Sequence, residues 1–158
     1  MRNLRALGIT CGIGSMLVGA RQAGFDIVGN IEWRKYYHRK DEQGRNTFTE
    51  NFPGAFFVQR IEQLSTEQIE LATGVDLVLG HPECGKYSRM NNNKANFREQ
   101  LHDPGDIPIF TGLVAKLKPR FFVMDDLPKS LIAYKAEDYA AALPDYDLFF
   151  EWISNFIS

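Results

Sequence analysis

Short apolar runs alternate with amphipathic stripes over nearly the whole chain, and this alternation leaves few folds open. Runs typical of buried strands span residues 4–10, 25–31, 55–58, 76–80, 121–124 and 146–153. Apolar residues at helical spacing predict helices over residues 16–23, 36–51, 109–117 and 136–143, and a capping-box spacing at 65–68 predicts another. Strands that alternate with helices predict an α/β fold: a doubly wound, mostly parallel sheet with helices on both faces.

The composition is that of one globular domain, which we expect to span residues 1–158. Hydrophobic residues make up 44% of the chain, but no stretch approaches the roughly 18 consecutive apolar residues that a membrane span needs. The first residues carry no secretory pattern. Membrane, collagen-like and disordered classes are therefore excluded. Two cysteines cannot build a disulfide framework, so we expect a protein of the reducing cytoplasm.

The formal net charge of −2 excludes a protein that is basic overall, but the charge is unevenly distributed. Residues 33–45 carry five Lys or Arg against two acids, and residues 86–102 carry four against one. Residues 125–158 carry two against seven. A local anion-binding face is therefore compatible with the composition.

Polar residues follow the predicted strands where each strand ends. The run at 4–10 leads into Cys11-Gly12-Ile13-Gly14, the next into Glu32-Trp33, the run at 76–80 into His81-Pro82-Glu83-Cys84, and the run at 121–124 into Asp125-Asp126. In doubly wound sheets, ligands bind outside the carboxyl ends of the strands. We therefore expect one rim of the sheet to collect these groups into a site.

Gly12 and Gly14 allow a tight strand-to-helix turn and a close approach of a ligand to the backbone. Glu32 lies 20 residues after Gly12, the distance at which such folds place a carboxylate on ribose hydroxyls. Because Leu17 stands where a dinucleotide motif has its third glycine, a smaller nucleoside such as S-adenosylmethionine is favoured, with Trp33 placed to cover the adenine. The alternative is that the glycines only turn the chain, Glu32 is solvated and Trp33 lines the core.

Cys84 follows a buried strand and begins a polar loop, where a substrate can reach a thiol. Nucleophilic use requires a lowered thiol pKa, which nearby cations can supply; the alternative is an unreactive structural cysteine. Cys11, in the first turn, is interpreted as a packing residue. His81-Pro82-Glu83 matches half of a zinc deaminase signature, but the P-C-x-x-C half is absent, so we expect no metal site.

Residues 81–105 differ in character from the rest of the chain. They contain Pro82, three consecutive Asn at 91–93, four cations and little apolar periodicity. A loop of this length in a compact domain is more often functional or disordered than idle. We expect it to close on a ligand; the alternative is a solvated surface segment.

Five segments, in order, resemble the motifs of the DNA (cytosine-5) methyltransferases. Gly80-His81-Pro82-Glu83-Cys84-Gly85-Lys86-Tyr87-Ser88 is similar to the family sequence G-x-P-P-C-Q-x-F-S. Cys11-Gly12-Ile13-Gly14-Ser15 resembles the end of D-L-F-C-G-x-G-G, and Glu32-Trp33 resembles the second motif. Residues 122–128 resemble F-V-x-E-N-V-P, and Asp103-Pro104 falls at D-P-R. The resemblance covers residues 4–152.

The resemblance implies the Rossmann-like fold of S-adenosylmethionine-dependent methyltransferases, with S-adenosylmethionine as cofactor and cytosine-containing duplex DNA as substrate. It implies Cys84 as the nucleophile on a flipped cytosine and Asp125 as the acid that assists at the ring nitrogen. The implied cofactor-binding residues are Cys11, Gly12, Ile13, Gly14, Glu32, Trp33, Gly80 and Pro82. The implied DNA contacts are Lys86, Ser88, Arg89, Lys94 and Arg98.

The chain departs from the family pattern within several of these motifs. Gly8 and Thr10 replace an Asp and a Phe, and Arg60 stands near where an Asp meets the adenine amino group. Glu83, Gly85 and Gly105 replace a Pro, a Gln and an Arg, and Asp125-Asp126 replaces Glu-Asn. The sequence also stops before the Q-x-R-x-R motif and the target recognition domain. We therefore expect a truncated or split catalytic domain that works with a second polypeptide.

Two other functions stay open at this point. The first is a catalytically inactive module that keeps the fold and binds the cofactor or DNA. The second is an NAD-dependent enzyme that uses the same glycine turn. Leu17 at the third glycine position and the Pro82-Glu83-Cys84 strand exit both count against the second.

Overall fold

The computed structural model describes residues 3–42, 45–87, 103–127 and 129–148. Contacts divide the chain into two compact units. The first comprises residues 1–82 and 116–125, and the second comprises residues 83–115 and 126–158. Each unit has its own buried residues and is described by itself.

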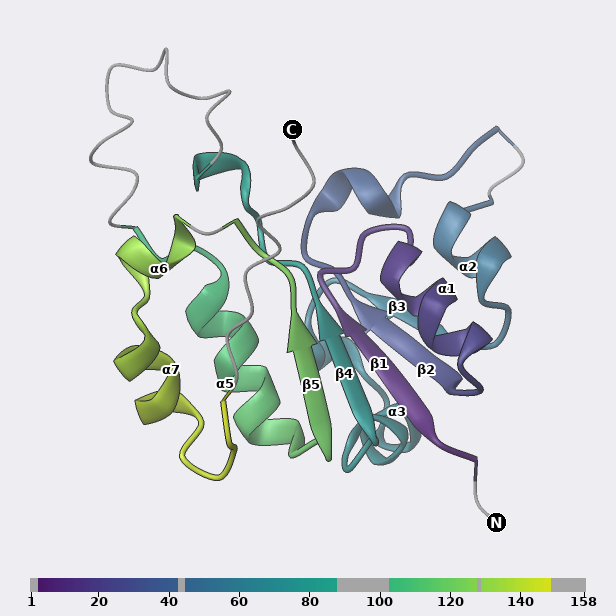
Figure 1. Ribbon diagram of the computed structural model, residues 1–158. Coiled ribbons are helices and arrows are strands. Elements are labelled where there is room, and N and C mark those ends of the chain that lie inside the picture. The colour runs from purple at the N-terminus through teal and green to yellow at the C-terminus, as the bar shows by residue number, and fades with distance from the viewer. Residues whose placement is uncertain (1–2, 43–44, 88–102, 128, 149–158) are drawn as a thin grey trace. The chain divides into compact units, whose positions relative to one another are not determined.

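The first unit is built on a five-stranded sheet in which every strand is parallel to its neighbours (Figure 1). The strands are β1 (Arg5–Ile9), β2 (Asp26–Ile31), β3 (Phe56–Val58), β4 (Leu77–Gly80) and β5 (Phe121–Met124), in the order β3-β2-β1-β4-β5. Five of the six predicted strands are thereby confirmed. The strand order changes direction between β1 and β4, and such a switch point is where open parallel sheets bind ligands.

Burial explains why these segments form a parallel sheet. In β1, Ala6, Leu7 and Ile9 are completely buried, as expected for a central strand that is covered on both faces. In β5, at one edge of the sheet, Phe121 and Val123 are exposed. The apolar runs of the sequence therefore mark strands whether or not both faces are covered.

Helices cover both faces of this sheet. α1 (Ser15–Gln22) packs against β1 and β2, α2 (Thr47–Asn51) against β3, and α3 (Thr66–Ala72) against β2; the short 3-10 helix η2 (Ile61–Gln63) precedes α3. In Figure 1, α1 lies in front of the sheet and α3 lies behind it. The capping box predicted at the start of α3 is confirmed, because Ser65 Oγ accepts from Gln68 N at 3.2 Å and Gln68 Oε1 accepts from Ser65 N at 3.0 Å.

The prediction of one helix over residues 36–51 is wrong for the part of this segment that the structure describes. A 3-10 turn, η1 (Lys35–His38), comes first, and α2 begins only at Thr47. Asn46 separates them, since its Oδ1 accepts from Phe48 N at 2.9 Å and its Nδ2 donates to Tyr37 O at 2.7 Å. An Asn that caps the next helix and binds the carbonyl of the previous turn favours two short elements over one continuous helix.

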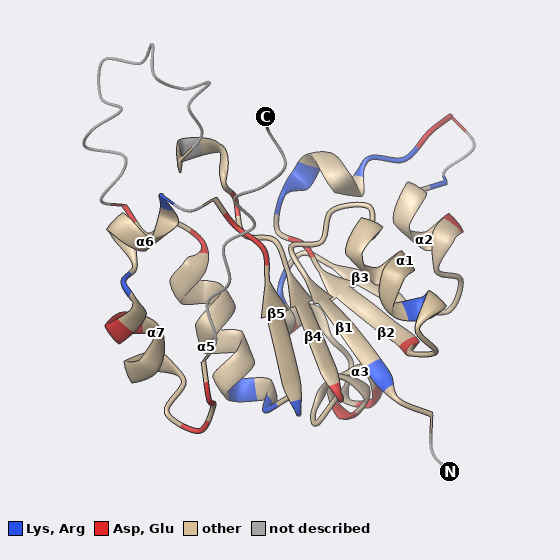
Figure 2. Ribbon diagram, viewed as in Figure 1, with Lys and Arg blue, Asp and Glu red and all other residues tan. Residues whose placement is uncertain are grey.

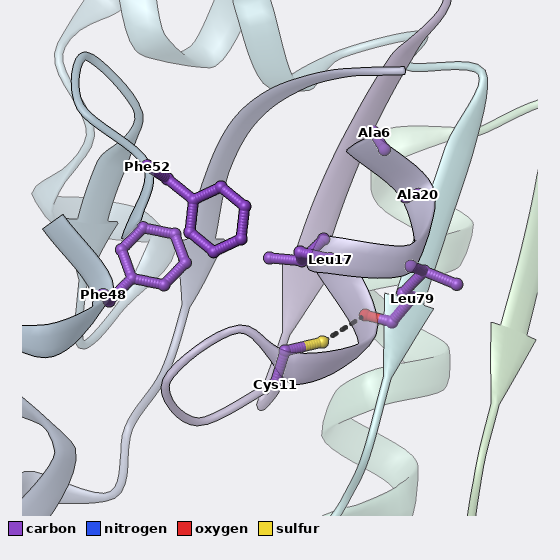
Figure 3. Close-up of a cluster of buried hydrophobic side chains, with 7 residues drawn as sticks. All are labelled: Ala6, Cys11, Leu17, Ala20, Phe48, Phe52 and Leu79. Atoms are coloured by element: carbon purple, nitrogen blue, oxygen red, sulfur yellow. Dashed lines mark hydrogen bonds between the residues drawn. The ribbon is translucent and has the colours of Figure 1, made fainter. Parts of the chain in front are cut away.

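One apolar cluster of the first unit holds α1 and α2 to the sheet (Figure 3). The rings of Phe48 and Phe52 lie 5.0 Å apart, and Phe48 stacks on Phe57 of β3 at 4.5 Å. Leu17 of α1 is completely buried. The buried members of the cluster are Ala6, Cys11, Leu17, Ala20, Phe48, Phe52 and Leu79.

The described residues of the second unit form short helices. They are η3 (Gly85–Tyr87), α5 (Ile107–Leu117), α6 (Ser130–Ala133) and α7 (Ala136–Ala142), with the last two residues of α5 belonging to the first unit. α5 and α7 confirm two predicted helices, whereas α6 was not predicted. The strand predicted over 146–153 is not formed at 146–148, and 149–153 lie outside the described residues. No described helix has the length and apolar character that a membrane crossing requires.

Within residues 81–105, which the sequence predicts as a functional loop, a hydrogen bond links Tyr87 to Asp103. The Tyr87 side chain is buried, and its hydroxyl donates to Asp103 O at 2.8 Å. Burial, and then the charge of Asp126, raises the pKa of Tyr87 to about 12, so this hydroxyl keeps its proton and the hydrogen bond at neutral pH. The segment between these two anchors, 88–102, lies outside the described residues.

Candidate functional site

The register of the sheet brings the residues that follow four strands to one edge. Ile9 pairs with Ile31 and with Gly80, and Gly80 pairs with Met124. The residues directly after these pairs therefore follow one another along the carboxyl edge of the sheet. They are Thr10, Glu32, His81 and Asp125.

The turn between β1 and α1 is held by hydrogen bonds from β2. Positive φ angles occur at Thr10 (56°), Gly12 (59°) and Gly14 (94°). Cys11 N donates to Asn30 Oδ1 at 3.4 Å, and Asn30 Nδ2 donates to Gly12 O at 3.1 Å. Thr10 itself donates from its backbone N to Ile31 O at 2.8 Å, and its left-handed conformation costs a non-glycine residue about 1–2 kcal/mol. The conformation of this turn therefore depends on contacts with β2 as well as on its two glycines.

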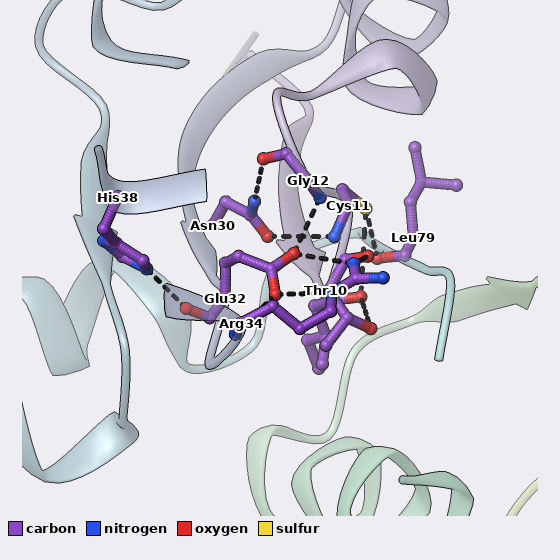
Figure 4. Close-up of polar contacts among 9 residues, drawn as sticks. Thr10, Cys11, Gly12, Asn30, Glu32, Arg34, His38 and Leu79 are labelled. Carbon is purple, nitrogen blue, oxygen red and sulfur yellow. Dashed lines mark hydrogen bonds and ion pairs between the residues drawn. The ribbon is translucent and has the colours of Figure 1, made fainter. Parts of the chain in front are cut away.

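The carboxylate of Glu32 is completely buried and accepts four hydrogen bonds (Figure 4). Its Oε2 accepts from Gly12 N at 2.8 Å and from Arg34 Nη2 at 2.7 Å. Its Oε1 accepts from the backbone N and from Nε of Arg34, at 2.9 and 2.8 Å. A carboxylate has about four lone-pair positions, so donors of the protein occupy all the positions of Glu32.

Arg34 is central to this edge, although the sequence analysis did not single it out. Besides its ion pair with Glu32, its Nη2 donates to Thr10 O at 2.5 Å, and its guanidinium lies 4.9 Å from the centre of the Tyr37 ring. Burial by itself lowers the pKa of Arg34, but the hydrogen bond and charge of Glu32 outweigh burial and raise this pKa. The one signal in the sequence is an Arg two positions after a strand-end Glu.

Tyr37 and His38 of η1 lie against the same groups. A Cβ added to Gly12 would lie 2.9 Å from Tyr37 Cζ, so the close approach that this glycine permits is made by a tyrosine ring of the same chain. Nε2 of His38 lies 2.5 Å from the Glu32 carbonyl oxygen. The segment 34–38 therefore contacts both the glycine turn and the strand-end acid.

The other residues that the resemblance places near the cofactor differ in how far they are buried and in what they contact. Cys11 is buried in the apolar cluster, and its Sγ donates to Leu79 O at 3.1 Å, which agrees with its interpretation as a packing residue. The Gly80 carbonyl accepts from Asp125 N at 2.9 Å. Pro82 is buried, Trp33 is half-buried, and Ile13 and Arg60 are exposed.

His81 and Asp125 form a pair at the ends of β4 and β5. His81 Nδ1 lies 3.1 Å from Asp125 Oδ2, and both side chains are open to solvent. An exposed pair contributes little to stability, so its interest is that it places an imidazole beside the carboxyl group that the resemblance implies as an acid. The sequence predicts that both residues lie at the same rim, but it does not specify that their side chains pair. Figure 2 shows the acidic segment that directly follows β5.

Cys84 belongs to the second unit, where it is half-buried and its carbonyl accepts from Tyr87 N at 2.9 Å. Lys86 lies in η3, whereas the other predicted DNA contacts, Ser88, Arg89, Lys94 and Arg98, lie outside the described residues. Where the structure is described, no three His, Cys, Asp or Glu side chains are grouped as a metal site requires.

We expect iodoacetamide to label Cys84 much faster than Cys11 in the folded protein. The thiolate is the reactive form, and burial raises the pKa of Cys11 to about 12, whereas Cys84 is partly open to solvent. A brief labelling reaction followed by mass spectrometry of the two peptides measures the ratio. In urea, where both thiols are exposed, the two rates should become similar. Faster labelling of Cys11 in the folded protein would contradict the nucleophile assignment.

No family model matches the chain. It is similar to the Type II methyltransferase M.AgeI of Thalassovita gelatinovora, with 26% identity over 131 residues that cover 78% of this chain and 28% of the relative. It is also similar to the Type II methyltransferase M.HgiDI of Herpetosiphon aurantiacus, with 23% identity over 150 residues that cover 90% of this chain and 43% of the relative.

Among solved structures, a crystal structure of a Spodoptera frugiperda DNMT2 mutant matches with a TM-score of 0.55 and 20% identity, over 90% of this chain and 41% of that chain. This likeness supports the fold. The chain spans less than half the length of each of these three proteins. The protein thus has the fold of this DNMT2 structure, and the two relatives that its sequence resembles are Type II methyltransferases.

Proposed function

We propose that this chain is the cofactor-binding and catalytic part of an enzyme that methylates carbon 5 of cytosine in DNA. The observation that carries the proposal is the carboxyl edge of the sheet, where the glycine turn, Glu32 and the His81–Asp125 pair follow neighbouring parallel strands. Edges of this kind bind nucleosides in α/β folds. The similarity to Type II methyltransferases supports the same reaction class.

The residues at this edge have the chemistry that S-adenosylmethionine requires. Glu32 is a buried acceptor suited to ribose hydroxyls, and Trp33 has a flat ring suited to adenine. When bound, the cofactor supplies an activated methyl group. Because Arg34 and Gly12 hold the Glu32 carboxylate, a ribose hydroxyl must exchange with one of these donors.

Cys84 and Asp125 are the proposed catalytic residues. Carbon 5 of cytosine is a weak nucleophile, and addition of the Cys84 thiolate to carbon 6 makes the ring an enamine that is a stronger one. Asp125 donates a proton or hydrogen bond to the ring nitrogen as the sulfur–carbon bond forms. His81, whose Nδ1 lies 3.1 Å from Asp125 Oδ2, holds this carboxyl group and is placed to exchange a proton with it.

Two further bond changes complete the reaction on the base. Once carbon 5 carries the methyl group, a base removes the remaining proton from carbon 5. The electrons of that bond restore the double bond between carbons 5 and 6, the Cys84 sulfur leaves carbon 6 as thiolate, and the ring nitrogen returns to Asp125 any proton that it received. Cys84 is thereby regenerated, so the residue acts as a nucleophilic catalyst.

The proposed DNA substrate requires a positive surface and an extruded base. Enzymes that react with a base take it out of the stack, and cations meet the phosphates. We assign these contacts to Lys86, Ser88, Arg89, Lys94 and Arg98, with a second polypeptide as the source of target recognition. A cytoplasmic location would keep the Cys84 thiol reduced.

Duplex DNA that contains 5-fluorocytosine tests the Cys84 step, because fluorine at carbon 5 cannot be removed as a proton and the adduct persists. With S-adenosylmethionine and a long incubation, we expect a covalent protein–DNA complex on a denaturing gel, because trapping requires only one slow turnover even without the second polypeptide. We expect Cys84→Ser to abolish this complex. Gly19→Ala is the control, since the added Cβ has nothing within 4 Å and should leave the complex unchanged.

A covalent complex that survives Cys84→Ser would contradict the nucleophile assignment. If the wild-type chain binds S-adenosylmethionine but forms no complex, the alternative function, an inactive cofactor- or DNA-binding module, is favoured. If it binds neither the cofactor nor DNA, both functions are excluded. The three outcomes are therefore distinguishable.

A further inference from the structure

We propose that Arg34 competes with the ribose of the nucleoside for the Glu32 carboxylate, and so determines how tightly the chain binds its cofactor. This inference rests on the proposed function, because it concerns the same edge of the sheet. It assigns a role to a residue that no motif marks. The contacts of Glu32, Arg34 and Tyr37 carry it in three steps.

The first step is that the Glu32 carboxylate has no acceptor position left for a ligand in this conformation. Both oxygens already accept two hydrogen bonds each, at 2.7–2.9 Å. Three of the four come from Arg34, two of them from its side chain (Figure 4). A ribose can therefore bind Glu32 only if a donor leaves, and the Arg34 side chain is the donor that can leave without unfolding the β1 turn.

The second step is that the position of Arg34 is built by the fold. Its side chain is 11% exposed, compared with 57% for Arg45 in the exposed ion pair with Asp41. The guanidinium also donates to Thr10 O and lies over the ring of Tyr37. A guanidinium held by a carboxylate, a carbonyl and an aromatic ring is placed much more firmly than a surface arginine.

The third step is the energy of the exchange. A forked arginine–carboxylate contact is charge-assisted, and such hydrogen bonds are roughly twice as strong as those of a neutral hydroxyl. Ribose hydroxyls therefore do not displace Arg34 without a cost. When only a fraction of the molecules has Glu32 free, the measured dissociation constant rises by the inverse of that fraction. Weakening the Arg34 contact increases the fraction of molecules with Glu32 free, and the measured dissociation constant should fall by the factor by which that fraction rises.

Titration calorimetry with S-adenosylhomocysteine, which lacks the reactive methyl group, measures this factor without any catalysis. The variant is Arg34→Lys, which keeps a positive charge near Glu32 but cannot make the two-pronged contact. We expect it to bind about tenfold more tightly than the wild-type chain, as for a competent fraction that rises about tenfold. Arg45→Ala removes the exposed ion pair instead and should leave the affinity unchanged.

A second pair of ligands tests whether the gain is at the ribose. Adenosine and 2′,3′-dideoxyadenosine differ only in the hydroxyls that Glu32 would accept. We expect Arg34→Lys to increase the preference for adenosine about tenfold relative to the wild-type chain. An equal preference in both proteins would overturn the proposal, because Glu32 would then be equally accessible to ribose with and without the forked contact.

Tyr37→Leu is the second variant, in case Arg34→Lys does not fold. It removes the ring beneath the guanidinium and leaves both charges in place, so we expect a smaller gain of about threefold. Far-ultraviolet circular dichroism confirms that each variant is folded. Unchanged or weaker binding by the folded variants overturns the competition and leaves the proposed function standing. If the wild-type chain and both variants bind no S-adenosylhomocysteine, the proposed cofactor fails, and the competition fails with it.

Discussion

Gly14→Ala is expected to lower the free energy of unfolding by about 2–5 kcal/mol. Gly14 has a φ of 94°, and a Cβ at this position would lie 2.4 Å from Phe52 Cε2, inside the apolar cluster. A left-handed conformation costs an alanine about 1–2 kcal/mol. Overfilling a packed core adds about 1–3 kcal/mol. Urea unfolding followed by circular dichroism measures the sum.

Gly24→Ala is the matched control for this prediction. Gly24 has a φ of 90°, but a Cβ there has nothing within 4 Å, so only the conformational cost of about 1–2 kcal/mol applies. The difference between the two variants isolates the contact of Gly14 with Phe52. Equal losses in the two variants would show that the cluster yields at Gly14 and that the ring is not closely packed there.

Glu32→Gln is expected to lower the free energy of unfolding by about 3–5 kcal/mol, because it leaves the largely covered Arg34 guanidinium, whose side chain is 11% exposed, without its charged partner. The Gln side chain also replaces one carboxylate oxygen by an NH₂ group. This group is a donor and faces Arg34 or Gly12 N, which are donors too, so at least one hydrogen bond is lost. Chemical unfolding measures the loss. Asp41→Asn, which breaks an exposed pair with Arg45, should cost less than about 1 kcal/mol.

The double variant Glu32→Gln with Arg34→Met decides whether the loss belongs to the ion pair. Removing both charges leaves no unpaired buried ion, so we expect the double variant to recover a large part of the stability that Glu32→Gln loses. If the double variant loses the sum of the two single losses, the residues do not interact energetically. The role given to Arg34 at this edge would then lose its basis.

Most of the helices and strands could be predicted from patterns among residues that are close together in the sequence. The apolar runs predict all five strands, because a strand that is buried in a parallel sheet needs little besides apolar residues. Ser65 and Gln68 predict the start of α3, since a capping box involves only residues three positions apart. The order of these elements predicts the parallel sheet, and the strand ends then predict which edge carries Glu32 and Asp125.

The residues that each side chain contacts could not be predicted from such patterns. Asn46 divides the predicted helix at 36–51, because it binds the carbonyl of Tyr37 while it caps α2. Gly14 was interpreted as room for a ligand, but the atom that approaches it belongs to Phe52. A glycine in the sequence indicates that something comes close to the backbone, and it does not say what.

Sequence alone therefore determined the parallel sheet and the acids at its carboxyl edge, because periodicity and spacing are properties of neighbouring residues. Only the tertiary structure decided what those acids contact. Glu32 is held by Arg34 and Gly12 N, and Asp125 pairs with His81. Arg34 is close to Glu32 along the chain, but its guanidinium also donates to Thr10 O, which lies 24 positions away. Such partners depend on how strands pair in space, and spacing along the chain does not specify that.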